Sequence, residues 1–347
     1  MKKGFTTGTC AQAAAKAAAV MLITGKVIKK VRVQTPSGAA LNLNLIGQKI
    51  KKTSASCAVV KDSGDDPDIT NGVKIHAEVR FSAQRGVTML GGRGIGRVTK
   101  PGLAVGVGEY AINPVPRQMI TREVGAFLPQ GKGLEVIISV PKGEELARRT
   151  FNPRLGIVGG ISIIGTSGIV VPKSLDAYKA SLSLQLDVLK AAGRKKAVLV
   201  LGYVGERFAK EVLKIDDDSI IKIGDHVGFM LKGCLKRKIK DILLIGHIGK
   251  LVKIARGQFD THSKFGDNRI DTIADYAKAC GARKDVIEEL LKQATAEAAI
   301  DILRKNGLMK VFERIAQKIT VSIKEFLGER ICVKCVLLSL KGDILSA

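Results

Sequence analysis

Two histidines and two lysines in the second half of the chain carry side chains suited to acid–base or anion-binding chemistry. His247 and Lys250 follow the apolar run DILLIG, and Lys253 lies one helical turn further on. His262 lies downstream in the polar segment DTHS. An imidazole titrates near neutral pH, and a lysine ammonium pairs with anions. Facing one crevice, these side chains could transfer a proton or bind an anionic ligand. Helix capping is the alternative for both histidines.

An acidic segment stands out in the first half, which has few carboxylates. Residues 63–72 read SGDDPDITNG, and Asp66 could act there as a general base or accept a hydrogen bond from a ligand amine. The alternative is a proline turn with an Asx cap. A calcium loop is disfavoured, because the twelfth position counted from Asp66 is Ala77 rather than a glutamate.

Two further segments of the first half could approach an anion. In NPVPR, which ends at Arg117, two prolines stiffen the backbone, so that Arg117 could meet a carboxylate in a fixed orientation. A rigid loop that enters a helix explains the same pattern. The glycine cluster at residues 91–96 could hold a phosphate or carboxylate on its backbone amides, or it could be a plain flexible turn.

The second half contains a weak internal repeat. The segments AVLVLGYVG, SIIKIGDHVG and DILLIGHIG each pass from an apolar strand through a glycine turn into a helical stretch. Three such units predict a parallel sheet with right-handed crossovers, whose ligands bind beyond the carboxyl ends of the strands. The candidate ligand-binding residues at these ends are Gly202, Gly205, Gly224, Asp225, Gly246 and Gly249.

The first half mixes strands with few helices, an α+β pattern. Residues 9–24 predict an alanine-rich helix capped by Thr7 or Thr9 and ended by Gly25, and residues 31–35 and 41–46 predict a hairpin. Further elements are expected as strands over 73–81 and 134–140 and as helices over 117–127 and 173–192. We expect a mixed-sheet α+β domain over residues 1–193. A Rossmann-like parallel-sheet α/β domain with a helical C-terminal part should follow over residues 194–347.

The charge balance limits the class of partner. The chain has 347 residues and a net charge of +25, and residues 1–190 hold 27 basic but only 12 acidic side chains. Such a potential attracts nucleic acid, a membrane surface or a small molecule with many carboxylates. Aromatic residues make up 4% and Trp is absent, which disfavours RNA binding by stacking. Neither a signal peptide nor a membrane helix is indicated.

The cysteines indicate a reducing, cytoplasmic setting. Six cysteines are scattered along the chain, and only Cys332 and Cys335 form a CxxC pair. Their apolar context predicts a strand, on which residues three apart point to opposite faces. We therefore expect neither a disulfide nor a metal site.

The polar signatures occur in a specific order along the chain. TTGTCA, SGDD, VTKPGL, AINPVPR, ISIIGTSGIV, GHIGK and THS together resemble the cobalt-precorrin-5B C1-methyltransferase family of anaerobic cobalamin synthesis. The resemblance implies S-adenosylmethionine as methyl donor and a cobalt-bearing tetrapyrrole as acceptor, with cobalt present only as part of the substrate. The segment Leu201-Gly202-Tyr203 departs from the family, which more often has a glycine–asparagine pair there.

This resemblance suggests a division of roles. The glycine turns of the second half would hold the donor, and Asp225 would accept its ribose hydroxyls unless it only caps a helix. His247, His262 or Asp66 would take the proton lost from the macrocycle. The residues expected to bind the acceptor and its carboxylates are Thr6, Thr7, Lys100, Asn113, Arg117, Lys250 and Lys253.

Two other functional classes stay open at this stage. An RNA-binding protein would explain the charge and would show a steep salt dependence. A tetrapyrrole carrier without transferase activity would bind the macrocycle but no methyl donor.

Overall fold

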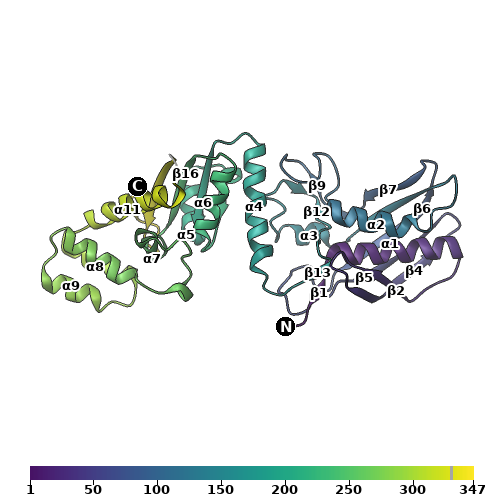
Figure 1. Cartoon of the computed structure of the whole chain (residues 1–347), viewed down its shortest axis with the longest axis horizontal. Helices are drawn as coiled ribbons and strands as arrows, with labels where there is room; N and C mark the ends of the chain where they lie inside the picture. Colours follow the sequence, from purple (N-terminus) through teal and green to yellow (C-terminus); the bar gives the residue numbers. More distant parts are fainter. Residues whose placement is uncertain (329–330) are drawn as a thin grey trace. The chain divides into compact units, whose positions relative to one another are not determined.

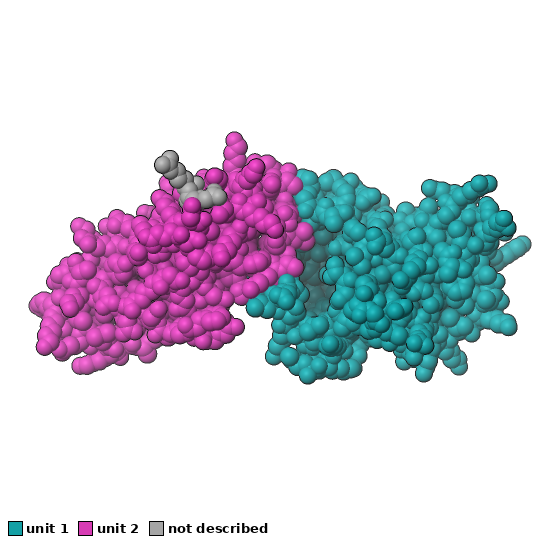
Figure 2. All heavy atoms as spheres, in the orientation of Figure 1, with its two compact units in different colours: residues 1–178 teal, residues 179–347 magenta. Residues whose placement is uncertain are grey.

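The computed structural model describes residues 1–328 and 331–347 (Figure 1). The chain divides into two compact units, Met1–Tyr178 and Lys179–Ala347, which Figure 2 colours separately. The division lies inside helix α4 (Leu175–Ala191), before the boundary expected at residues 194–196. The buried side chains of α4 all come after residue 181. Asp187 of this helix pairs with Arg237 of the second unit at 2.7 Å. Most of α4 therefore packs with the second unit.

The first unit is built around a mixed five-stranded sheet. Its order is β4-β5-β6-β10-β7, and only β10 and β7 are parallel neighbours. The expected strands over 73–81 and 134–140 are β6 and β10, and the expected hairpin is the β2–β3 pair, so the mixed-sheet prediction is confirmed. The elements of this unit are β1 (Gly4–Phe5), α1 (Thr7–Thr24), β2 (Lys30–Gln34), β3 (Ala40–Asn44), β4 (Ile46–Ile50), β5 (Ser54–Val60), β6 (Lys74–Ser82), β7 (Gly86–Gly91), β8 (Gly94–Ile95), β9 (Arg97–Val98), α2 (Pro114–Gly125), β10 (Gly133–Ser139), α3 (Gly143–Ala147), β11 (Ile157–Val158), β12 (Gly160–Ile161) and β13 (Ile169–Val170).

Helix α1 forms the centre of the first core. It contacts β5, β6 and α2 (Figure 1), and all of its alanines are fully buried. Because alanine ends at Cβ, the helix can lie close to the sheet on one side and to α2 on another. Gly25 ends the helix in the left-handed region, as expected, but the N-cap is Thr6 rather than Thr7 or Thr9. Helix α2 likewise begins earlier than expected, at Pro114, because proline suits a first helical turn.

The glycine cluster at residues 91–96 is a packing site. The amides of Gly92 and Gly96 donate to the carbonyls of Ile138 and Ile161, so they do not cradle a ligand. Gly94 has a φ of +75°, and a Cβ there would lie 1.8 Å from the Val140 carbonyl oxygen. Only glycine allows these chain segments to approach so closely. These contacts favour packing for Gly92, Gly94 and Gly96, and anion binding by this cluster stays a prediction.

A buried ion pair anchors the acidic segment. The Lys61 side chain is 1% exposed, and its ammonium donates to the Asp68 carboxylate at 2.6 Å and to the Ser63 hydroxyl at 2.5 Å. Asp68 also accepts from the amide and hydroxyl of Thr70. Burial raises the Asp68 pKa, but the hydrogen bonds from Lys61 and Thr70 outweigh it and hold the pKa below its usual value.

The second unit contains a five-stranded sheet in the order β15-β14-β16-β17-β18. The first four strands are parallel neighbours and β18 is antiparallel at the edge. The elements are β14 (Lys196–Leu201), α5 (Gly202–Glu211), the 3₁₀ helix η1 (Asp217–Ser219), β15 (Ile220–Lys222), α6 (Val227–Lys236), β16 (Asp241–His247), α7 (Ile248–Leu251), η2 (Val252–Arg256), η3 (Ser263–Phe265), α8 (Arg269–Ala279), α9 (Lys284–Leu291), α10 (Ala296–Lys305), α11 (Lys310–Leu327), β17 (Cys332–Leu338) and β18 (Ile344–Ser346).

The expected parallel sheet of the second unit is confirmed by these pairings. Val198 and Val200 of β14 pack with Ile245 of β16 and with Phe208 of α5 on one face of the sheet. Strand β17 carries the CxxC pair, and Cys332 is exposed whereas Cys335 is buried. The two thiols thus point to opposite faces, as the sequence predicts. A Rossmann-like assignment for the whole domain goes beyond these pairings and stays a prediction.

Breaking the buried pair should destabilise the chain strongly. We expect Asp68→Asn to lower the free energy of unfolding by about 3 kcal/mol, because it leaves the Lys61 ammonium buried without a counter-charge. Asp62→Asn, which removes the exposed Lys2–Asp62 pair, should cost less than about 1 kcal/mol. Urea titrations followed by circular dichroism measure both. Equal losses of unfolding free energy in the two variants would contradict the buried Lys61–Asp68 pair as a stabilising contact.

The same pair predicts a pH dependence. Its stabilisation is complete above the ordinary carboxyl pKa and is lost as the pH falls through the lowered pKa of Asp68. Between neutral pH and acid, the parent protein should therefore lose more stability than the Asp68→Asn variant. Parallel slopes of stability against pH would exclude this contribution.

Candidate active site

The carboxyl edge of the second sheet has the geometry of a ligand site. From β14 the chain passes through α5 to β15 on one side, whereas β16 lies on the other side of β14. The strand order therefore reverses between β14 and β16, where open parallel sheets bind ligands. Helix α5 begins at Gly202 and helix α7 begins just after Gly246, so both helix N-termini lie at this edge.

The glycines of this edge serve two needs. Gly202 and Gly224 have φ values of +74° and +57°, which let the chain turn sharply after β14 and β15. Gly205 and Gly246 allow close packing, because an added Cβ would lie 2.8 Å from the Ile245 carbonyl oxygen and 2.9 Å from Leu201 Cβ, respectively. Gly249 lies beneath the His247 ring. A position such as Gly202 also has open space beside it.

Asp225 joins three segments at this edge. Its carboxylate accepts from the Lys250 ammonium at 2.9 Å and from the Thr261 hydroxyl at 2.8 Å. The Thr261 amide also donates to the Asp225 carbonyl at 3.0 Å. Burial raises the Asp225 pKa, but Lys250 and Thr261 lower it more, so this carboxyl has a lowered pKa and stays ionised. In this way the loop after β15, helix α7 and the DTHS loop are held together.

Lys253 shapes the DTHS loop from inside. The residue is 3% exposed, and its ammonium donates to the carbonyls of Thr261 and Gly266 at 3.2 and 3.0 Å. A buried ammonium must keep its hydrogen bonds, since an unpaired buried charge is costly. Lys253 thus stabilises the DTHS loop through its carbonyls. The expected contact of Lys253 with an acceptor carboxylate stays a prediction. Lys250 is more exposed but already pairs with Asp225.

His247 connects the edge to distant segments. Its Nδ1 accepts from the Gly249 amide at 3.2 Å, which leaves Nε2–H to donate to Glu297 at 3.1 Å. Glu297 in turn accepts from the Leu340 amide. Burial lowers the His247 pKa more than Glu297 raises it, so the ring is neutral at pH 7. Both ring nitrogens are therefore occupied, and the capping interpretation is confirmed.

His262 is the more accessible histidine. Its Nδ1 caps η3 by accepting from the Lys264 amide at 3.1 Å, so capping is confirmed here as well. The ring is exposed, which keeps Nε2 available to a ligand, and it lies close enough to Asp225 to lower the pKa of that carboxyl. The structure thus brings together Asp225, Lys250, Lys253 and His262, whereas His247 lies against α10.

In the first unit, three predicted residues, Thr6, Thr7 and Asn113, contact residues 162–168, and Arg117 bonds to residues 110 and 112 instead. Thr6 caps α1, and the Thr7 hydroxyl donates to the Ile164 carbonyl and accepts from its amide. The Asn113 amide donates to Ile163, although the Asn113 side chain does not cap α2. Arg117 donates to the carbonyls of Ile112 and Tyr110. These contacts hold the loop in place, and the expected acceptor contacts of the four residues stay predictions.

Lys100 and Asp66 lie apart from that cluster. The Lys100 side chain packs over Gly156, where an added Cβ would meet its Cγ at 2.4 Å. Asp66 accepts from the Lys173 amide at 2.8 Å and so joins the acidic loop to the segment that precedes α4. This long-range contact is not the local Asx cap that was the alternative, and the general-base role of Asp66 stays a prediction.

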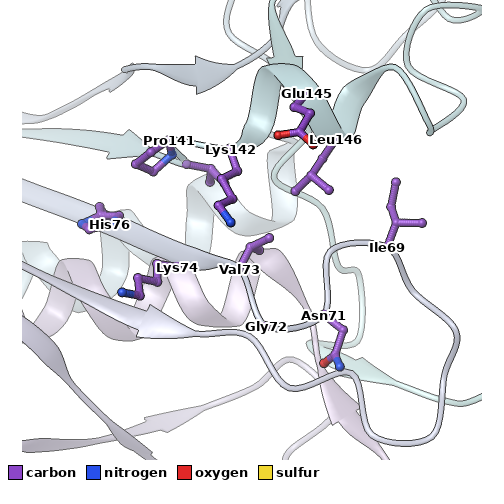
Figure 3. A pocket seen from close by; sticks show the side chains of 11 residues that line it. Ile69, Asn71, Gly72, Val73, Lys74, His76, Pro141, Lys142, Glu145 and Leu146 are labelled. Carbon is purple, nitrogen blue, oxygen red and sulfur yellow. The ribbon is translucent and has the colours of Figure 1, made fainter.

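A pocket of about 450 Å³ lies beside the acidic loop (Figure 3). Lys74 and His76 at the start of β6 line it together with Lys142 after β10. His76 is half-buried on β6, and burial, followed by Lys74, lowers its pKa. The pattern of β6 gave no sign of this pocket, because its opposite wall is formed by residues about 65 positions later.

Sequence reasoning also missed the Lys61–Asp68 pair and the partner of His247. A lysine directly after the apolar strand SASCAVV, followed by four aspartates, was the available signal for the pair. Glu297 gave no comparable signal, because it lies fifty residues from His247 on another helix.

Metal sites and membrane spans were sought over residues 1–328 and 331–347. Within these ranges no group of three or more His, Cys, Asp or Glu side chains could hold a metal ion. Nor is any helix of the described chain long and apolar enough to cross a membrane.

The fold defines a mixed α/β protein with a parallel sheet whose carboxyl edge is the candidate ligand site. The chain belongs to the CbiD family: the family model described as CbiD matches residues 1–172, and the model described as CbiD, C-terminal domain, matches residues 260–347.

Similar proteins cover the whole chain. A relative from Alkaliphilus metalliredigens is 43% identical over 100% of this chain and 92% of its own length. One from Thermoanaerobacter sp. (strain X514) is 45% identical over 100% of this chain and 95% of its own. Both are named cobalt-precorrin-5B C(1)-methyltransferase. The crystal structure of a cobalamin biosynthesis protein (cbiD) from Archaeoglobus fulgidus is 29% identical and matches 76% of this chain and 83% of that chain, with a TM-score of 0.40.

Replacing the buried lysine should loosen the DTHS loop. We expect Lys253→Met to speed hydrogen exchange of the amides at residues 261–266 by about tenfold or more, because the charged hydrogen bonds to two loop carbonyls are lost. Lys278→Met, a change at an exposed position of α8, serves as the control. Exchange mass spectrometry measures both, and an unchanged loop in Lys253→Met would contradict this assignment.

Proposed function

We propose that the chain transfers a methyl group from S-adenosylmethionine to C1 of cobalt-precorrin-5B, giving cobalt-precorrin-6A. The observation that carries this proposal is the similarity of 43–45% identity over the full chain to relatives named for that reaction. The six free cysteines agree with the reducing, cytoplasmic setting in which we place it.

The donor site is proposed at the carboxyl edge of the second sheet. The reversal of strand order between β14 and β16 supports it, as do the left-handed Gly202 and the open space beside that residue. Asp225 is ionised and lies at the end of β15, where it could accept hydrogen bonds from two ribose hydroxyls. Lys250 and Thr261 would hold the carboxylate in place for this task.

Chemistry at this site needs positioning more than activation of a nucleophile. The sulfonium of S-adenosylmethionine supplies an activated methyl group. Burial raises the pKa of the Cys57, Cys234 and Cys335 thiols to about 12, so they stay protonated at neutral pH and are poor nucleophiles. What remains for the protein is to align the macrocycle carbon with the methyl–sulfur bond.

Of the three candidates for taking the macrocycle proton, His262 is the one that we favour. Its exposed ring uses only Nδ1 for capping, whereas both nitrogens of His247 have partners and Asp66 accepts from the Lys173 amide. Lys100, Arg117, Lys250 and Lys253 are proposed to pair with carboxylates of the acceptor. The excess of basic residues over 1–190 supports a substrate with several carboxylates.

Methyl transfer can be tested directly. Incubation with isotopically labelled S-adenosylmethionine and cobalt-precorrin-5B, without oxygen, should place the label on C1 of the macrocycle, as located by NMR. Tight macrocycle binding without transfer, beside an active control enzyme, would favour a carrier instead. Binding of neither ligand would contradict both functions.

The ribose role of Asp225 gives a second test. We expect Asp225→Ala to weaken S-adenosylmethionine binding by about tenfold or more in calorimetry, because two hydrogen bonds to a charged group are lost. Asp241→Ala, at the opposite end of the same sheet, is the matched control and should bind as the parent does. Unchanged affinity in Asp225→Ala would remove Asp225 from the donor site.

A further inference from the structure

The pocket beside the acidic loop lies entirely within the first unit. It forms where β6 begins and β10 ends, and these strands are paired there with His76 opposite Ser139. One wall is the loop at residues 69–73, and the other is the segment at residues 140–146, which includes the start of α3 (Figure 3). The residues proposed above for the donor or the acceptor do not line it.

Both walls are held in place by contacts behind them. The buried Lys61–Asp68 pair fixes the acidic loop, and the Asn71 side-chain oxygen accepts from the Ser63 amide at 2.9 Å. On the other side, Gly94 and Gly143 approach so closely that a Cβ on Gly143 would lie 2.0 Å from the Gly94 carbonyl oxygen. The signature SGDDPDITNG therefore supplies one wall of the pocket, and the glycine cluster packs behind the other.

The polar lining favours an anion. Lys74 and Lys142 contribute two positive charges and Glu145 one negative charge, with His76 beside them. In Figure 3 the Lys142 side chain extends across the pocket toward Val73. Over the described part of the chain, neither Lys74 nor Lys142 has a carboxylate within salt-bridge distance, whereas Lys61 and Lys250 are paired.

The hydrogen-bond donors and the apolar floor narrow the ligand class. Because the Asn71 oxygen is occupied by the Ser63 amide, its NH₂ group is the part left to contact a ligand. Val73 and Val140 are buried in the floor, and Ile69 and Leu146 are half-buried beside them. A cationic rim over an apolar floor suits a carboxylate on a short hydrocarbon arm better than a bare inorganic anion.

We propose that this pocket binds one carboxylate-bearing arm of the acceptor macrocycle, with Lys142 and Lys74 as its cationic partners and the Asn71 amide as a donor. The identity of the acceptor rests on the function proposed above, whereas the carboxylate preference rests on the pocket alone. The bound arm would hold one edge of the macrocycle at the first unit.

Kinetics of labelled methyl transfer test the pocket in the full-length protein. Lys142→Ala and Lys74→Ala should each raise KM for the acceptor by about two- to fivefold and leave kcat within about twofold, because each removes a partly exposed ion pair that does not touch the reacting carbon. Lys51→Ala removes the same charge from an exposed position outside the pocket and should leave KM unchanged. A KM that does not move in the pocket variants would overturn the proposal.

The His76 ring provides a readout that does not require activity. A carboxylate bound beside it would offset the charge of Lys74, which lowers the His76 pKa, and would so raise that pKa. The negative charge of Glu145 opposes binding of the carboxylate but not this rise. We expect titration of the ¹⁵N-labelled protein with the metal-free uroporphyrin to raise the His76 pKa measured by NMR. Lys142→Ala should reduce this effect, and Lys51→Ala should not.

The two readouts separate the pocket from the proposed function. If the parent transfers methyl normally but uroporphyrin leaves His76 unchanged, the pocket assignment is wrong while the function stands. If no methyl is transferred but uroporphyrin raises the His76 pKa in a Lys142-dependent way, the function fails and the carboxylate site stands. A rise of the His76 pKa with citrate but not with uroporphyrin would also overturn the pocket proposal, since the pocket would then select small anions.

Discussion

The carboxylate of Asp225 is the contact on which the candidate site depends. It accepts from Lys250 and Thr261, and so ties together the loop after β15, the start of α7 and the DTHS loop. Lys250 and Thr261 keep the pKa of this half-buried carboxyl low, against the effect of burial. Lys253 supports the same loop through two backbone carbonyls. Asp225, Lys250 and Lys253, which the sequence suggests as ligand contacts, thus already bond to other parts of this edge. His262 and the glycine turns are its more accessible parts.

In the first unit, the sequence signatures also order loops, through close packing at glycines and bonds to backbone groups. Its signatures include glycines that let a neighbouring segment approach closely, such as Gly8 against the Pro116 ring and Gly165 against the Thr6 side chain. The Thr6 and Thr7 hydroxyls and the Arg117 guanidinium bond to backbone groups nearby. Precise packing of this kind holds the loops rigid. Rigid loops can in turn orient a large, charged substrate, because binding then needs little reordering.

Local patterns predicted much of this fold. Apolar runs that end in glycine identified the strands and turns of the parallel sheet, because such signals span only a few neighbouring residues. Side-chain partners were harder to predict. The ring of His247 meets Glu297, and the ammonium of Lys253 meets backbone carbonyls rather than a charged residue. Nothing in the sequence indicates which carbonyl a buried lysine will reach, and the pocket at His76 needs two strands to pair before it exists.

A crystal structure of the protein with S-adenosylhomocysteine tests the central claim most directly, namely that the carboxyl edge of the second sheet is the donor site. The account predicts the ligand beyond the ends of β14, β15 and β16, with its ribose hydroxyls on Asp225 and its backbone contacts at the turn of Gly202. Density for the ligand at the amino edge of that sheet, or confined to the first unit, would contradict the account.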